Sequence, residues 1–207
     1  MKLIAHFFYS LAVTVLVSGC TSPVAAVGSA AIQLMGLTKP ETPEDQKPPR
    51  KIPLQIEAGI NLNGDEKRRA QAIVIRLYHL KDANAFWLAP YDTFINPDRD
   101  KVALGNNLVS MQEITLAPGQ SYKVTEQVAR QAKYIGVVAL FYSPNPHRWR
   151  IAFDTEKSEK EGILIGVHSC ALTATRGSIQ GSQAPVKNTQ TTLWNSLLSV
   201  NCPASAT

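Results

Sequence analysis

The chain has 207 residues, of which 44% are hydrophobic and 18% are charged. This length accommodates one ordinary domain with extensions, and the composition is that of a globular protein. The formal net charge of +5 comes without any run of five or six like charges, so nucleic-acid binding is not indicated. Large enzymes, repeat arrays and multispanning membrane proteins are excluded.

The N-terminus has the features of a secretory signal. Lys2 precedes an apolar run from Phe7 to Val17, which is long enough for a signal-peptide core and too short to span a membrane. Val17-Ser18-Gly19-Cys20 follows and resembles the lipobox of bacterial lipoproteins, whose cysteine is acylated and becomes the new N-terminus. We predict a lipoprotein signal peptide over residues 1–19 and a covalent lipid on Cys20. An ordinary secretory signal is the alternative.

The residues after Cys20 are predicted to form a tether. Residues 39–53 contain five prolines, and charged side chains fill most of the other positions. Such a segment does not form a packed core and acts as a semi-rigid spacer. The sequence therefore predicts a lipidated, Pro-rich tether over residues 20–51 and a folded domain over residues 52–172. Thr21 stands where an aspartate would favour inner-membrane retention, which resembles lipoproteins sent to the outer membrane.

From residue 52 onward, apolar residues recur at every second position. Residues 52–62 predict a strand with one buried face, which includes Ile60 and Leu62. Further strands are predicted over residues 70–80, 110–116, 121–125, 134–142, 149–153 and 163–172. Pro118-Gly119 is predicted to form a type II turn within a hairpin. About seven short strands joined by turns predict a mainly-β, antiparallel β-sandwich.

The stretch from Asp82 to Ile95 interrupts these strands. Its aromatic residues recur at roughly helical spacing, and Asp82 could cap a helix. We expect short helices that bridge two strands, with their aromatic rings packed as core rather than lining a ligand pocket. Residues 154–161 are predicted to form a solvated hairpin connection, and residues 173–207 a polar C-terminal extension.

Catalytic motifs are not evident in the sequence. The four histidines lie at no metal-ligand spacing, and neither a G-x-S-x-G nor a phosphate-binding glycine-rich loop occurs. His79 and His168 lie in predicted strands, where a packing role is more common than ligand binding. The sequence thus predicts a binding module with no enzymatic activity, no metal, no cofactor apart from the lipid on Cys20, and no small-molecule substrate.

Cys170 and Cys202 are candidates for a disulfide. Acylation would consume Cys20, so one pairing remains, and the bacterial periplasm favours oxidation. The bridge would close a loop of about 33 residues and hold the C-terminal segment against the domain. Two unpaired thiols are the alternative.

The order of the segments resembles that of a known family. After the lipobox and the tether come, in order, IVIRLYHL from Ile73, then Phe86, Leu104-Gly105, Pro118-Gly119, YIGVVA from Tyr134, and Trp149-Arg150. This succession, over about residues 52–172, is similar to the TssJ (SciN, VasD) family, the outer-membrane lipoproteins of the type VI secretion system. The long tether and the residues beyond Leu172 depart from the family pattern.

The resemblance implies a transthyretin-like sandwich with a small helical insertion, anchored in the outer membrane and facing the periplasm. It also implies docking to the periplasmic C-terminal domain of TssM, the IcmF-like inner-membrane protein, and through it to TssL. In the family the loop between the first two strands takes part in this contact, and here that loop is Asn61 to Arg69. The predicted partner-binding residues are Asn63, Gly64, Asp65, Glu66, Lys67, Arg68 and Arg69. Arg68 and Arg69 are favoured over Lys67, because guanidinium groups bind carboxylates bidentately.

Other functions remain open from the sequence. One is a lipoprotein chaperone or pilotin of another secretion apparatus. Another is a periplasmic enzyme or small-ligand-binding protein built around Trp87, Tyr91 and His79. For the loop itself, a solvated connection without a partner is the alternative.

Overall fold

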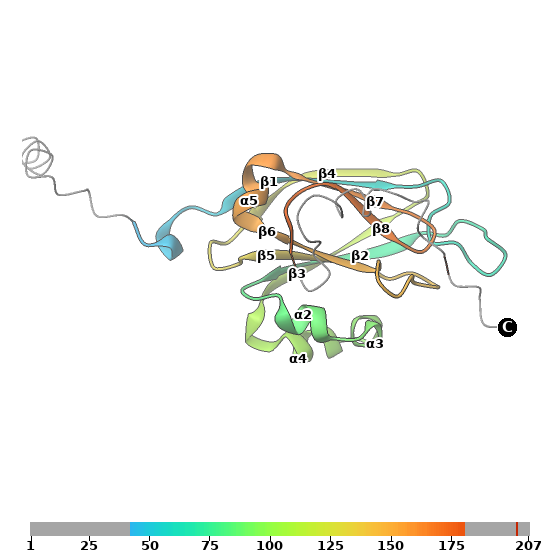
Figure 1. Ribbon diagram of the computed structural model, residues 1–207, viewed down its shortest axis with the longest axis horizontal. Helices are drawn as coiled ribbons and strands as arrows, with labels where there is room; N and C mark the ends of the chain where they lie inside the picture. The colour runs from blue at the N-terminus through green and yellow to red at the C-terminus, as the bar shows by residue number, and fades with distance from the viewer. Residues whose placement is uncertain (1–41, 181–201, 203–207) are drawn as a thin grey trace, which may run out of the picture. The chain divides into compact units, whose positions relative to one another are not determined.

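Two β-sheets pack face to face in the computed structural model, which describes residues 42–180 and residue 202 (Figure 1). The first sheet has the order β4-β1-β7-β8 and consists of β1 (Arg50–Ala58), β4 (Ser121–Val128), β7 (Ile163–Val167) and β8 (Leu172–Arg176). The second has the order β3-β2-β5-β6-β9 and consists of β2 (Ile73–Leu80), β3 (Leu108–Leu116), β5 (Tyr134–Ala139), β6 (Arg150–Asp154) and β9 (Ile179–Gln180). Among the described strands, β1 and β7 pair in parallel and the other neighbours are antiparallel.

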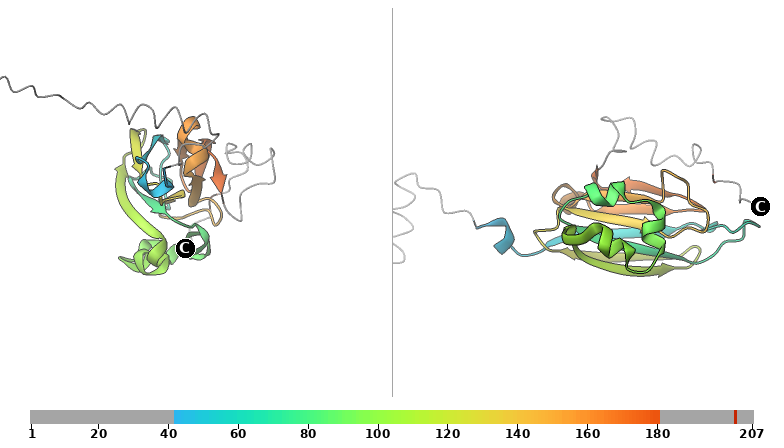
Figure 2. Two further views of the ribbon diagram at one scale, coloured as in Figure 1. Left: turned by 90° about the vertical axis from the view of Figure 1, so that its left-hand side faces the viewer. Right: turned by 90° about the horizontal axis from the view of Figure 1, so that it is seen from below.

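Short helices occupy several connections. Figure 2 shows from below that the helical insertion covers the outer face of the second sheet; it consists of α2 (Asn84–Leu88), α3 (Tyr91–Ile95) and α4 (Arg99–Leu104). The 3-10 helix η2 (Gly105–Asn107) follows it, η1 (Glu44–Gln46) precedes β1, and α5 (Thr155–Glu161) joins β6 to β7. No helix in the described part of the chain is long and apolar enough to cross a membrane. The predicted mainly-β sandwich with a small helical insertion is confirmed.

The core lies between the sheets because the strands alternate apolar and polar residues. The inward-facing residues of β1 and β2 are almost fully buried: Ile52, Leu54, Ile56, Ile73, Ile75 and Leu77. The central strand β5 is buried from Ile135 to Ala139, since one face contacts the core and the other lies beneath the helices. This explains why its sequence is apolar at successive positions.

The aromatic cluster of the helical insertion is core packing, as predicted. Phe86 and Phe94 have no exposed surface, and their ring centroids lie 5.6 Å apart. Phe86 contacts the backbone of β5 at Gly136, where an added Cβ would lie 2.8 Å from the ring. A glycine at this position therefore lets the helix α2 approach the sheet closely.

Two half-buried arginines of the second sheet bind the helices through backbone carbonyls. Arg76 donates from Nη1 to the carbonyl oxygen of Phe94 at 2.6 Å and contacts Asp100 Oδ2 at 3.1 Å. Arg150 donates to the carbonyl oxygens at the end of α2, those of Phe86, Trp87 and Ala89. Burial lowers the pKa of Arg150 to about 10. Arg76 and Arg150 both belong to the segments that carry the family resemblance, and these contacts give them a structural role.

The predicted hairpin between residues 110–116 and 121–125 is wrong. Its turn is present, since Gln120 N donates to Ala117 O at 3.1 Å and Gly119 has φ +75°. However, β3 pairs with β2 and β4 pairs with β1, so the turn carries the chain from one sheet to the other. The turn residues are the same in both arrangements, and the pairing depends on contacts that are distant in the sequence.

The predicted solvated connection over residues 154–161 is instead the helix α5. The side chain of Asp154 accepts a hydrogen bond from Lys157 N at 2.9 Å and caps the helix, which ends before Gly162 at φ +71°. The single strand predicted over residues 163–172 is two strands, because residues 168–171 form a turn between β7 and β8. Residues 173–180, which we assigned to the C-terminal extension, contribute to β8 and β9.

The first residues of β1 are fixed by a cluster of charges. Arg50 is 2% exposed, and its Nη2 lies 2.7 Å from Glu44 Oε1. Its Nε lies 3.5 Å from Glu159 Oε2 on α5. Arg130, after β4, donates to the carbonyl oxygen of Pro48 at 2.6 Å. Residues 44–50 are thereby attached to the end of the sandwich where α5 lies.

Candidate partner-binding site

The loop between β1 and β2 extends beyond the sheets, at the end of the sandwich opposite α5 (Figure 1). The strand predicted over residues 52–62 ends at Ala58, so residues 59–72 belong to this loop. Gly59 accepts a hydrogen bond from Gly119 N, which places the turn between β3 and β4 beside the loop. The turn between β7 and β8 contacts the loop as well, since His168 O accepts from Asn63 N.

Asn63 and Gly64 anchor the loop rather than present it to a partner. Asn63 is 7% exposed, with φ 45°, and its side chain donates to Ala72 O at 2.9 Å and accepts from Tyr142 N at 2.7 Å. Gly64 N donates to Ser169 O at 3.0 Å, and a Cβ at Gly64 would lie 2.5 Å from Ser169 Oγ. These two of the predicted partner-binding residues therefore attach the loop to the β7–β8 turn.

Asp65 organises the tip of the loop. Its Oδ1 accepts hydrogen bonds from Lys67 N and Arg69 N at 2.9 and 2.8 Å, and its Oδ2 lies 2.7 Å from both Nε and Nη2 of Arg69. The hydrogen bond from the Arg69 side chain is the main cause that lowers the pKa of Asp65. The guanidinium of Arg69 is thus already engaged within the loop, which argues against its predicted role as a free binding group.

Glu66 is paired with a residue from a different connection. Tyr142, between β5 and β6, donates its phenol to Glu66 Oε1 at 2.8 Å, and this bond raises the pKa of Tyr142. Tyr142 is nevertheless 59% exposed. The Tyr142 ring therefore forms part of the surface beside the loop, although it lies 76 residues from Glu66 in the sequence.

Lys67 and Arg68 remain as charged groups directed to solvent. Both are exposed, and neither has an ion pair with another residue in the described parts of the chain. Ile60 is 87% exposed at the base of the loop, which contradicts its predicted burial. The alternating pattern continues through Leu62, but the strand ends before Ile60. The tip therefore presents two unpaired cations beside the exposed Tyr142 ring, and Ile60 adds exposed apolar surface at the base of the loop.

A disulfide joins the C-terminal segment to the turn that anchors the loop. Cys170 and Cys202 are bonded, with their Cα atoms 5.6 Å apart, and these are the cysteines that the sequence predicted to pair. The Cys170 carbonyl oxygen also accepts from Asn145 N at 2.8 Å. Residues 168–171 therefore contact three segments: the β1–β2 loop, the β5–β6 connection and the C-terminal segment. Burial lowers the pKa of His168 in this turn.

The other candidate residues of the sequence do not converge with the loop. Cys20 lies outside the described residues. Tyr91 donates to the carbonyl oxygen of Phe141 at 2.6 Å and packs edge-on against Trp149, while Trp87 contacts Phe86. Within residues 42–180 and at 202, no group of three or more His, Cys, Asp or Glu side chains could hold a metal ion.

A family model for T6SS-SciN, described as type VI secretion lipoprotein (VasD, EvfM, TssJ), matches residues 50–170. The chain belongs to the type VI secretion lipoprotein family. The match begins at the first residue of β1 and ends at Cys170, so this family's region includes the helical insertion and the β1–β2 loop. No curated protein sequence matches the chain.

Solved structures of type VI secretion proteins are similar to the chain. The T6SS lipoprotein TssJ1 from Pseudomonas aeruginosa is 25% identical, with a TM-score of 0.56, over 65% of this chain and 99% of that one. A chain of a type VI membrane complex is 26% identical, with a TM-score of 0.56, over 60% and 97% of the two chains. A chain in a structure described as the T6SS protein TssM C-terminal domain from EAEC is 26% identical, with a TM-score of 0.53, over 60% and 96%.

Proposed function

We propose that this chain is the outer-membrane lipoprotein of a type VI secretion membrane complex, in which it docks the periplasmic C-terminal domain of TssM and, through TssM, associates with TssL. The family match over residues 50–170 carries this proposal. Chains of similar fold from structures described as a type VI membrane complex and a TssM C-terminal domain support the choice of partner. The role is that of a docking protein rather than an enzyme, and it uses no cofactor.

The anchor in this proposal is a lipid on Cys20, exposed by removal of residues 1–19. A cysteine that carries more than one acyl chain would hold the protein stably in the membrane. Residues from Cys20 up to the start of β1 at Arg50 would form the tether, which is shorter than the predicted 20–51, and the charges around Arg50 would join it to the sandwich. The folded domain would then face the periplasm at some distance from the outer membrane.

The docking surface in this proposal is the tip of the β1–β2 loop. Asp65 holds the tip in one conformation before a partner arrives, which reduces the entropy lost on binding. Lys67 and Arg68 would contact acidic groups of TssM, while Tyr142 supplies apolar area at the tip and Ile60 at the base of the loop. Apolar and aromatic side chains that lose water on binding contribute most of the affinity of such interfaces.

The proposal is tested by binding and by localisation. Isothermal titration of the chain from residue 21 onward with the periplasmic C-terminal domain of TssM from the same organism should show a saturable complex. In cells, the unaltered chain should incorporate labelled palmitate and sediment with outer-membrane vesicles, whereas Cys20→Ser should do neither and should abolish type VI secretion. Absence of a complex with TssM would refute the docking role, and palmitate-free protein in the outer membrane would refute the anchor.

A further inference from the structure

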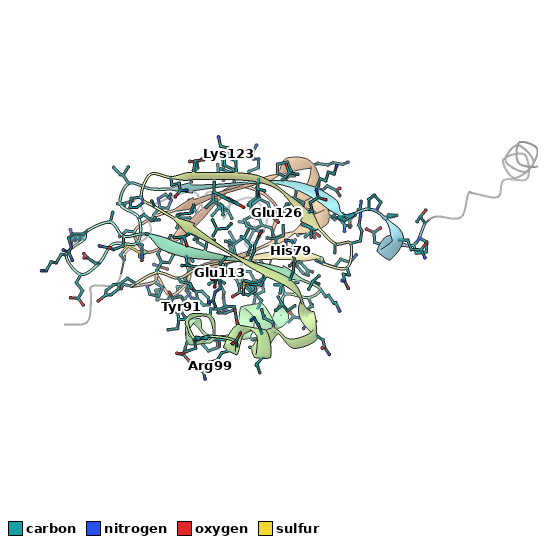
Figure 3. The ribbon with its side chains drawn as sticks, turned by 180° about the vertical axis from the view of Figure 1, so that it is seen from behind. His79, Tyr91, Arg99, Glu113, Lys123 and Glu126 are labelled. Atoms are coloured by element: carbon teal, nitrogen blue, oxygen red, sulfur yellow. A yellow bond between two sulfur atoms is a disulfide. The ribbon has the colours of Figure 1, made fainter. Side chains whose placement is uncertain are left out.

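The sandwich is open along the side where β3 and β4 lie. β3 is paired on one edge with β2 and β4 on one edge with β1, and neither has a second strand partner among the described residues. The two strands are joined by the turn at residues 117–120 and then separate, as Figure 3 shows from behind. A groove of about 410 Å³ lies between them.

The interior of the sandwich changes from apolar to polar along this groove. Residues of β3 that face the other sheet are Leu116 and Ile114, which are buried, and then Gln112 and Ser110, which line the groove. β4 places Glu126 opposite them, and Gln112 Nε2 donates to Glu126 Oε1 at 2.6 Å. Ser110 Oγ lies 2.9 Å from His79 Nδ1 on β2. A polar network thus occupies a position where a sandwich ordinarily has core side chains.

Two atoms of this network face each other without a hydrogen bond. His79 Nε2 lies 3.6 Å from Glu126 Oε2, and Nε2 is buried with no hydrogen-bond partner. His79 is 8% exposed and Glu126 is 7% exposed, and both side chains point into the groove between the strands (Figure 3). When Nδ1–H donates to Ser110, Nε2 carries a lone pair. A lone pair and a carboxylate oxygen then face one another, and an added N–H donor would satisfy both.

We propose that this groove binds an extended, basic segment of a partner protein, which adds to the free edge of β4 and inserts an arginine or lysine side chain toward Glu126 and His79. The free edge offers unpaired backbone groups to a strand, and alternate side chains of an added strand would point into the groove. The Glu126 carboxylate selects a cation. Leu77, Tyr122 and Val124 on the groove walls would contact the aliphatic part of that side chain. This site is distinct from the loop proposed to dock TssM, and it does not depend on that proposal.

The probe for this site is a capped nonapeptide of alternating threonine and arginine, titrated into the ¹⁵N-labelled chain from residue 21 onward. Amide shifts should concentrate at residues 110–112 and 124–127, and the free amides of β4 should become protected from hydrogen exchange. The matched probe replaces each arginine by citrulline, which keeps the shape and removes the charge, and it should bind at least tenfold more weakly. Equal binding of the two peptides, or shifts centred on other residues, would overturn the proposal.

The Glu126→Gln variant should bind the arginine peptide at least tenfold more weakly than the unaltered chain does. Glu113→Gln on β3 is the matched control, because its carboxylate faces the helical insertion, where it lies 2.6 Å from Arg76 Nε, and the variant should bind within twofold of the unaltered chain. If Glu126→Gln does not fold, the comparison of the arginine and citrulline peptides on the unaltered chain still tests the proposal. Protection of the β4 amides without any peptide would show that the chain's own tether or a second copy fills the groove, which would also overturn the proposal.

Discussion

The backbone N–H of Asn63 donates to the carbonyl oxygen of His168 at 3.0 Å. This bond joins the base of the candidate partner-binding loop to the β7–β8 turn, two positions before Cys170. Gly64 N and Ser169 O repeat the contact one residue further on. The conformation of the loop therefore depends on the segment that also carries the disulfide.

The charge of the loop tip should matter for docking. The double variant Lys67→Glu/Arg68→Glu should weaken the complex with the TssM domain at least tenfold, about 1.4 kcal/mol, because two exposed cations become anions opposite an acidic partner. Isothermal titration measures this change. Lys160→Glu on α5, at the other end of the sandwich, is the control and should bind within twofold. Unaltered affinity of the double variant would place the binding surface elsewhere.

Asn63 should contribute to stability through its side-chain amide. Asn63→Ala leaves the partly buried amide of Tyr142 and the carbonyl of Ala72 without their partner, which should cost about 1–3 kcal/mol of unfolding free energy in urea. The exposed neighbour Asn61 is the matched control, and Asn61→Ala should change stability by less than about 0.5 kcal/mol. Equal stability of the two variants would contradict a structural role for Asn63.

The Cys170–Cys202 disulfide should stabilise the domain. Cys202→Ala removes the bridge at its exposed end and leaves the buried Cys170 in place, so the loss should be about 3–4 kcal/mol in the chain-entropy description. A reductant should destabilise the unaltered chain by the same amount and leave the variant unchanged. Labelling of the denatured, unreduced chain from residue 21 onward provides a direct check, because two reactive thiols per chain would mean that no bridge forms.

Glu126 should make the unfolding free energy of the domain depend on pH, with a loss of stability in acid. The adjacent His79 imidazole and the hydrogen bond from Gln112 lower the pKa of Glu126 in the folded state, although burial acts in the opposite direction. Between the folded and unfolded pKa values the unfolded state binds more protons, so stability rises with pH and falls as the pH drops below about 4.5. Glu126→Gln should therefore lose less stability between pH 5 and pH 3 than the unaltered chain in urea unfolding. An identical loss in Glu126→Gln would contradict this assignment, and the exposed Glu161→Gln is the control.

The sequence predicts those elements whose burial produces a clear pattern. β5 is predicted because both of its faces are covered, and the helical insertion because aromatic residues such as Phe86 must be buried. The helix α5 has no apolar stripe, and its ends are marked by Asp154 and Gly162, so a search for periodicity misses it. The separation of β3 from β4 depends on pairing with β2 and β1, which no local signal specifies.

The candidate site is predictable only in part for similar reasons. The family resemblance identifies the loop, and its charged residues are evident in the sequence. The roles within it come from distant contacts: Tyr142 with Glu66, and Asn63 with the β7–β8 turn. Ile60 was misassigned because the alternating pattern continues after β1 has ended.

The strand β1 has a mechanical consequence if the proposed anchor and docking surface are correct. Tension from the lipid would enter at Arg50 and leave through the loop after Ala58, so the load would run along the strand from one end to the other. β1 lies between β4 and β7, with backbone pairs on both sides. A pull along this axis would load these bonds together in shear rather than open them one after another. The domain would therefore resist unfolding by a force applied between the outer membrane and TssM.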